Sequence, residues 1–183
     1  FSPLHSQADM VSYGMTPQIP SRKREPGRRR TDNKNGVVLH EGSDVVVIAT
    51  GLKAKSANAK TGGMVQVYVL LRDMSPLAAV KVGADVAICG MCPHRGAIVG
   101  GKLVGRRCYV NLGQGPRSVW QAYTNGRYGR ADVSEYPTLF GGRAIRLGAY
   151  GDPAFIPRHI VQALTSVASM WTGYTHQWRT NAW

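Results

Sequence analysis

The segment GRAIRLGAYGDPAFIPRHIVQALTSVASMWTGYTHQW, residues 142–178, decides the fold class of this chain. Its first nine residues are mostly apolar and predict a buried strand, which the Gly-Asp-Pro that follows would end. Residues 157–169 carry apolar side chains at helical spacing, and the last eight residues predict another strand. This order of strand, helix and strand is typical of parallel α/β architecture.

The rest of the chain extends this pattern. Apolar and β-branched runs predict further strands, and two segments that begin with Ser-Pro and Gly-Pro predict helices. The predicted strands are residues 37–40, 44–50, 64–71, 84–89 and 107–112, and the predicted helices are residues 75–83 and 115–126. We therefore expect an α/β fold, either a partial (β/α) barrel-like structure or an open parallel sheet, with a basic and flexible N-terminal arm.

Length and composition limit the classes of protein to consider. The chain has 183 residues, of which 43% are hydrophobic, and this suits one domain with a substantial core. No apolar run reaches about 18 residues, so we expect no membrane-spanning helix. The first residues lack the basic and apolar regions of a signal peptide. We expect residues 1–35 to form the arm and residues 36–183 to form an α/β domain with a cysteine metal site.

The charge of the chain indicates a polyanionic partner. The formal net charge is +13, an excess that favours nucleic acid or another polyanion. Arginine predominates in the arm and pairs well with phosphates, although a solvated linker is the alternative. A lysine-bearing loop is a second candidate for phosphate contact, with a plain solvated loop as its alternative. The candidate nucleic-acid-binding residues are Arg22, Lys23, Arg24, Arg28, Arg29, Arg30, Lys53, Lys55 and Lys60.

Three cysteines form the most specific pattern in the chain. Cys89 and Cys92 have the C-x2-C spacing of metal-binding turns, and Cys108 follows after fifteen intervening residues. Thiolates are soft ligands that suit zinc or iron. A structural zinc site needs a fourth ligand, for which His94 is nearest, whereas three cysteines suffice for a [4Fe–4S] cluster with one open iron. The alternative is that three reduced thiols simply fill the core.

Polar residues that follow the predicted strands are candidates for a ligand cleft, because parallel α/β folds bind ligands beyond the carboxyl ends of their strands. Asp152 and His176 are the candidate catalytic residues; the alternatives are a helix cap for Asp152 and a structural role for His176. A cluster of aromatic and arginine residues around Trp120 suits single-stranded nucleic acid, and core packing explains it at least as well. The other candidate cleft residues are Asn111, Gln114, Tyr174 and Gln177.

Four segments carry a resemblance to a known family. They are CGMCPHR (89–95), CYVNLGQGPRSVWQAY (108–123), RLGAYGDP (146–153) and TGYTHQW (172–178). Their combination resembles phage- and plasmid-encoded radical-SAM-like proteins, over about residues 60–178. The resemblance implies a partial (β/α) barrel with ligands at the carboxyl ends of its strands. It also implies a [4Fe–4S] cluster on the three cysteines, with S-adenosylmethionine, or a zinc ion in the place of the cluster.

Two functional hypotheses follow. The first is a radical-SAM-like cysteine-metal protein of a mobile element such as a phage, acting on or near nucleic acid. The second is a zinc-stabilised, non-enzymatic nucleic-acid-binding or virion-associated structural protein. The sequence does not decide whether the chain is an enzyme.

The cysteines also bear on location, and the end of the chain bears on assembly. An odd number of cysteines with a C-x2-C pair indicates a reducing compartment, so we expect a cytoplasmic location in the host cell or a virion-associated one. We expect no membrane contact. The chain stops soon after its last predicted strand, which suggests an oligomer or a partner chain that completes the fold.

Overall fold

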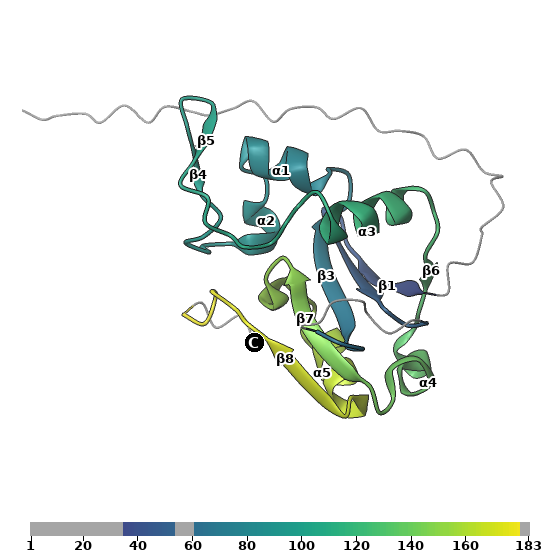
Figure 1. Ribbon diagram of the computed structural model, residues 1–183. Coiled ribbons are helices and arrows are strands. Elements are labelled where there is room, and N and C mark those ends of the chain that lie inside the picture. Colours follow the sequence, from purple (N-terminus) through teal and green to yellow (C-terminus); the bar gives the residue numbers. More distant parts are fainter. Residues whose placement is uncertain (1–34, 54–60, 180–183) are drawn as a thin grey trace, which may run out of the picture.

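The computed structural model describes residues 35–53 and 61–179, and one mixed six-stranded sheet organises this part of the chain (Figure 1). The strand order is β6-β1-β2-β3-β7-β8. The strands are β1 (Gly36–Glu41), β2 (Val45–Thr50), β3 (Val65–Leu71), β6 (Gly129–Arg130), β7 (Ala144–Tyr150) and β8 (Met170–Gly173). A separate hairpin, which projects from the body, consists of β4 (Ala97–Val99) and β5 (Lys102–Val104).

The directions of the strands divide the sheet into two parts. β1, β2 and β3 form an antiparallel meander. β7 pairs parallel with β3, β8 pairs parallel with β7, and β6 pairs parallel with β1. The structure therefore confirms an α/β chain with a mostly parallel central sheet.

Five α-helices and two 3-10 turns connect or flank these strands in the described residues. Ser75 caps the first helix through a bond from the backbone N–H of Ala78 to its hydroxyl, and Pro76 occupies the first turn, as predicted. α1, α2 and α3 gather near β3, and α5 follows β7 (Figure 1). The elements are α1 (Pro76–Val82), α2 (Val86–Cys89), α3 (Gly115–Thr124), η1 (Val133–Glu135), α4 (Tyr136–Phe140), η2 (Pro153–Phe155) and α5 (Arg158–Val167).

The core is built on the alternation of β3. Val65, Val67 and Val69 are fully buried, whereas the residues between them are half-buried. Val65 pairs with Ile145 of β7, so the apolar faces of the two strands coincide. The buried side of α5 belongs to the same core, in agreement with the apolar face predicted for residues 157–169.

The strand predicted over residues 84–89 is wrong, because most of this segment is helical. The backbone N–H of Cys89 donates to the carbonyl of Asp85 at 2.9 Å, and Gly90 donates to Val86 at 2.8 Å. The apolar alternation misleads here because Val86 is exposed, while the polar Asp85 is buried and forms an ion pair with Arg95 at 2.9 Å. Cys89 therefore lies at the end of a short helix rather than at the end of a strand.

The strand predicted over residues 107–112 is also wrong. Arg106 donates from its guanidinium to the carbonyls of Cys108 and Val110, both at 3.1 Å, so a side chain replaces the neighbouring strand. The last predicted strand ends early, at Gly173, because side chains rather than a strand accept the next backbone donors. The N–H of His176 bonds to Asp152, and the N–H of Gln177 bonds to the hydroxyl of Thr175.

The predicted arm falls outside the described residues except for its last residue, Asn35. The carbonyl of Asn35 accepts the backbone N–H of Gly51 at 2.9 Å, and its side chain accepts that of Lys53 at 3.1 Å. Of the residues predicted to bind nucleic acid, Lys53 is described and exposed, and Arg22, Lys23, Arg24, Arg28, Arg29, Arg30, Lys55 and Lys60 lie outside the described residues. Among the helices described, none is long and apolar enough to cross a membrane.

Candidate thiol site

All three cysteines line one cavity of about 420 Å³. Its other walls come from the carboxyl half of β7 with the turn that follows it, and from the end of β8 with the segment that follows it. This position beyond the ends of two parallel strands is where α/β folds usually bind ligands. We name it the thiol cavity; its lining is Cys89, Cys92, His94, Arg107, Cys108, Tyr109, Val110, Arg146, Leu147, Gly148, Tyr150, Gly151, Asp152, Thr172, Gly173, Tyr174 and His176.

Local backbone bonds bring the three thiols together. Cys89 ends α2, and the N–H of Cys92 donates to the carbonyl of Cys89 at 3.2 Å, which closes the turn between them. The chain then passes through the projecting hairpin and returns. The N–H of Cys108 donates to the carbonyl of His94 at 2.9 Å, so the third cysteine lies against the turn that carries the first two. All three thiols are reduced and half-buried.

The surroundings of Cys89 and Cys92 favour the neutral form of these two thiols. Burial raises the pKa of Cys89 to about 12, and the negative charges of Asp85, Cys92 and Cys108 add to this effect. Burial also raises the pKa of Cys92, while a hydrogen bond from the backbone at His94 opposes the rise. Because each thiolate disfavours the others, three ionised thiols in this cavity call for a compensating positive charge.

Two histidines stand together at the cavity. The rings of His94 and His176 meet edge to face, with centroids 5.3 Å apart, and both residues are exposed. The structure thus brings His94 into the same cavity as the cysteines, as the sequence predicts, and adds His176. A neutral imidazole is a common metal ligand, so both are candidates for a fourth position beside three sulfurs.

Asp152 lies in the wall of the thiol cavity and is buried. One carboxylate oxygen accepts the N–H of Ala154 at 2.9 Å, which caps the 3-10 turn η2, and the other accepts the N–H of His176 at 2.7 Å. Its own N–H donates to the carbonyl of Ile88 at 2.7 Å. Asp152 therefore joins the end of β7, the segment after β8 and the helix that carries Cys89.

The four residues predicted to line a cleft separate in the structure. Tyr174 lines the thiol cavity and is exposed. Gln177 is buried; its amide donates to the carbonyl of Cys89 at 3.1 Å and accepts the N–H of Met91 at 3.3 Å, so it holds the cysteine turn from outside the cavity lining. Asn111 accepts the N–H of Gly113 in a local turn, and Gln114 precedes α3. Neither of these two residues lines the cavity.

The sequence does not indicate ten residues of the cavity lining, among them Arg107, Tyr109, Arg146 and Tyr150. The hydroxyl of Tyr150 has no hydrogen-bond partner in the described part of the chain, although the side chain is 3% exposed. Burial raises the pKa of Tyr150, so its hydroxyl stays protonated at neutral pH. The one signal in the sequence was the position of Tyr150 at the end of a predicted strand, directly before Gly-Asp.

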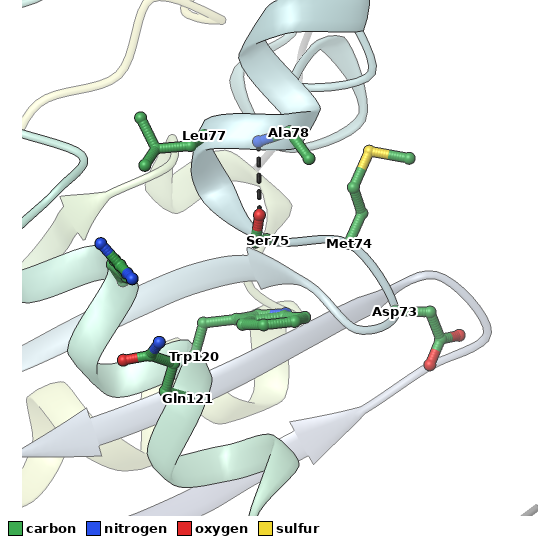
Figure 2. Close-up of a pocket in the computed structure, with 8 residues that line it drawn as sticks. Asp73, Met74, Ser75, Leu77, Ala78, Trp120 and Gln121 are labelled. Atoms are coloured by element: carbon green, nitrogen blue, oxygen red, sulfur yellow. Dashed lines mark hydrogen bonds between the residues drawn. The ribbon is translucent and has the colours of Figure 1, made fainter. Parts of the chain in front are cut away.

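A second cavity, of about 580 Å³, lies between the start of α1 and α3 (Figure 2). The indole of Trp120 forms part of its wall and donates to the carbonyl of Leu71 at 3.1 Å. Tyr123, one turn further along α3, is buried, and its hydroxyl donates to Glu41 at 2.8 Å. Packing and hydrogen bonding thus account for the aromatic residues of α3, which supports the core alternative over a base-stacking role.

The fold and the site together define an α/β protein with a cavity that carries three thiols and two imidazoles. Comparisons of the chain with family models, with curated proteins and with solved structures found no match. Among residues 35–53 and 61–179, no group of three or more His, Cys, Asp or Glu side chains is placed as a ready set of metal ligands. The lining does include three sulfurs and two imidazole rings, which are the donor types that thiophilic metals prefer.

Proposed function

We propose that this chain is a cysteine-metal protein that acts on or near nucleic acid, with Cys89, Cys92 and Cys108 as the ligands of a [4Fe–4S] cluster or a zinc ion. One observation carries the proposal: every cysteine of the chain lines the same cavity, although Cys108 is distant from the other two in sequence. Thiols that merely fill a core have no reason to converge at the ligand-binding edge of a parallel sheet.

A cluster is the form that the odd number of cysteines supports. Three cysteines leave one iron of a [4Fe–4S] cluster open, and the resemblance to radical-SAM-like proteins assigns that position to S-adenosylmethionine. Proteins of that family carry their cysteines as C-x3-C-x2-C in one loop, whereas this chain has C-x2-C-x15-C. The return of Cys108 to the turn of Cys89 and Cys92 supports the same three-thiolate set despite the different spacing. A partial barrel is the finer form of the fold that we propose with it.

A non-enzymatic zinc protein is the second candidate, and the position of His94 and His176 favours it. Structural zinc sites are closed by four protein ligands, and either imidazole would supply the one that three cysteines lack. Such a site would stabilise the fold by joining α2, the segment around Cys108 and, through His176, the end of β8. This form of the protein would bind nucleic acid, or serve in a virion, without a reaction.

In both forms we propose a polyanionic partner. The formal net charge is +13, and basic residues outnumber acidic ones in the arm and also in the described part of the chain. The lysines and arginines assigned to nucleic-acid binding in the sequence remain candidates for phosphate contact. A reducing location, cytoplasmic or virion-associated, suits free thiols that bind a metal.

Metal analysis of the full chain tests the proposal. Anaerobic purification should give either brown protein with iron and sulfide bound, or colourless protein with about one zinc ion per chain. Replacement of Cys89, Cys92 or Cys108 by Ser should remove the metal. Met91→Ala is a matched control, because Met91 lies in the same turn, is 79% exposed and does not line the cavity. Protein without either metal, with three freely titratable thiols, would contradict both candidates.

A further inference from the structure

Two tyrosines stand exposed at the mouth of the thiol cavity. Tyr109 is 80% exposed and Tyr174 is 82% exposed, yet both line the cavity. They come from different segments, one between the hairpin and α3 and the other directly after β8. Large rings that the fold leaves in water beside a cavity are typical of binding surfaces, since burial would otherwise stabilise them in the core.

Arginine accompanies these rings. The guanidinium of Arg146, on β7, donates to the hydroxyl of Tyr109 at 2.8 Å, and Arg107 lies exposed in the same lining. Asp152 is the one carboxylate among the described residues of the lining, and both of its oxygens already accept backbone N–H groups. The mouth therefore presents positive charge together with aromatic faces.

The wall of the cavity includes a buried tyrosine. Tyr150 is almost fully buried, lines the cavity, and leaves its hydroxyl without a hydrogen bond to any described residue. The hydroxyl oxygen itself is inaccessible to water, so other atoms of Tyr150 line the cavity. The volume of about 420 Å³ lies within the range of cavities that hold small organic groups.

From these observations we infer that the mouth of the thiol cavity binds a single-stranded nucleic acid, stacking unpaired bases on Tyr109 and Tyr174 and holding phosphates with Arg107 and Arg146. Exposed aromatic rings beside arginines are the features by which proteins bind single strands without base-pair readout. The inference rests on the nucleic-acid partner of the proposed function and names where that partner binds.

Paired variants of the full chain test the role of the rings. Fluorescence anisotropy with short labelled single strands of DNA and of RNA measures the dissociation constant. Tyr109→Leu and Tyr174→Leu should each weaken binding about tenfold, because one stacked base is lost. Tyr174→Trp should bind at least as tightly as the native chain, which separates loss of stacking from damage to the fold. A difference between the DNA and RNA strands would show which of the two the site prefers.

Trp171 provides the matched control. It is 57% exposed, like the mouth tyrosines, but it pairs with Ile145, so its side chain lies on the opposite face of the sheet from Arg146 and Thr172. Trp171→Leu should therefore leave the dissociation constant unchanged. Equal binding by the native chain, Tyr109→Leu and Tyr174→Leu would overturn the inference, and so would an equal loss in Trp171→Leu.

Salt dependence separates stacking from phosphate contact. Arg107→Gln should lower the slope of log K against log salt by about 0.7, whereas the tyrosine variants should leave the slope unchanged. Arg158→Gln, an exposed charge on α5 outside the cavity lining, should leave the slope unchanged. An unaltered slope in Arg107→Gln would overturn the phosphate contact.

Metal content, measured on the same samples, keeps the two proposals distinguishable. Loss of binding in the tyrosine variants of a chain without metal supports the nucleic-acid site and contradicts the metal. If the chain contains metal and the native protein and the tyrosine variants bind nucleic acid equally well, the result supports the proposed metal site and contradicts the nucleic-acid site at the mouth of the cavity.

Discussion

The raised pKa of Cys89 makes its reactivity a test of the site at the scale of a single residue. The thiolate is the reactive form of cysteine, and burial shifts the pKa of Cys89 from 9.0 to about 12. In metal-free native protein, alkylation of Cys89 by iodoacetamide should be slow at neutral pH and should accelerate only as the pH approaches 12. In urea, all three cysteines should react at similar rates, as peptide mass spectrometry would show.

The same shift sets the sign of a pH effect on stability. The unfolded thiol loses its proton near pH 9, whereas the folded thiol keeps it to about pH 12. The folded state therefore binds more protons than the unfolded state between pH 9 and pH 12. The contribution of the Cys89 thiol to the free energy of unfolding is complete below pH 9 and is lost as the pH rises toward 12. A bound metal would replace the proton and would also protect the thiol, so the alkylation experiment needs metal-free protein. Rapid alkylation of Cys89 at neutral pH in that protein would contradict a buried thiol.

Gly151 shows how closely β7 and β3 approach beside the cavity. Its φ is +75°, and a Cβ at this position would lie 2.6 Å from the carbonyl oxygen of Val69. Gly151→Ala should lower the free energy of unfolding by about 3 kcal/mol, because both the left-handed backbone and the overlap oppose a methyl group. Gly142 has a φ of +70°, and a Cβ at this position would have no atom within 4 Å. Gly142→Ala should therefore lower the free energy of unfolding by only about 1 kcal/mol. Equal losses in urea unfolding would show that β3 yields to the methyl group.

At the scale of the elements, Asp152 holds three segments of the thiol cavity in place. Asp152→Asn should lower the free energy of unfolding by about 2 kcal/mol, because the amide can accept one of the two N–H groups but turns a donor toward the other. Hydrogen exchange at His176 should become faster, since its N–H loses its acceptor.

Asp132→Asn serves as the control for this change. Asp132 also precedes a 3-10 turn at the N-cap position, but it is exposed, and Asn is as good a cap as Asp. Its replacement should change the free energy of unfolding by less than about 0.5 kcal/mol. A similar small change in Asp152→Asn would contradict the role that we assign to the second oxygen.

The elements that the sequence predicts well are those whose signals are local. The strands β2, β3 and β7 follow from β-branched and apolar runs, and the start of α1 follows from Ser75 and Pro76. The segment of residues 84–89 fails because its structure depends on a distant ion pair between Asp85 and Arg95. Residues 107–112 fail because the guanidinium of Arg106 takes the place of a neighbouring strand, which no periodicity reveals.

The candidate site divides in the same way. The C-x2-C motif marks Cys89 and Cys92 directly, and the rule that ligands bind at the ends of parallel strands points to Asp152 and His176. Tyr109 carried no signal, because its importance comes from its exposure at the cavity and from its bond to Arg146. The same rule of strand ends predicts Asn111 and Gln114 as cleft residues, but the strand expected over residues 107–112 does not form.

At the scale of the whole molecule, the thiol cavity depends on segments that are far apart in the chain. Cys89 and Cys92 come from the region before the hairpin, Cys108 from the region after it, and the rest from β7, β8 and their ends (Figure 1). β7 and β8 form one side of the cavity. The carboxylate of Asp152 accepts the N–H of His176, and the amide of Gln177 donates to the carbonyl of Cys89, so these two bonds hold the segments around His176 and Cys89 in place. A metal held by three thiols would join these segments further and raise the free energy of unfolding.

Variants of the N-terminal arginines test whether the net charge or a particular part of the chain attracts the polyanion. The triple change of Arg28, Arg29 and Arg30 to Gln should lower the slope of log K against log salt by about 2 for single strands. The same loss of three charges at the exposed residues Lys81, Arg127 and Arg158 should leave the slope almost unchanged, because a contact with phosphate and not the total charge releases counterions. Equal slopes in the two triple variants, measured by anisotropy titrations at several salt concentrations, would show that total charge alone attracts the nucleic acid.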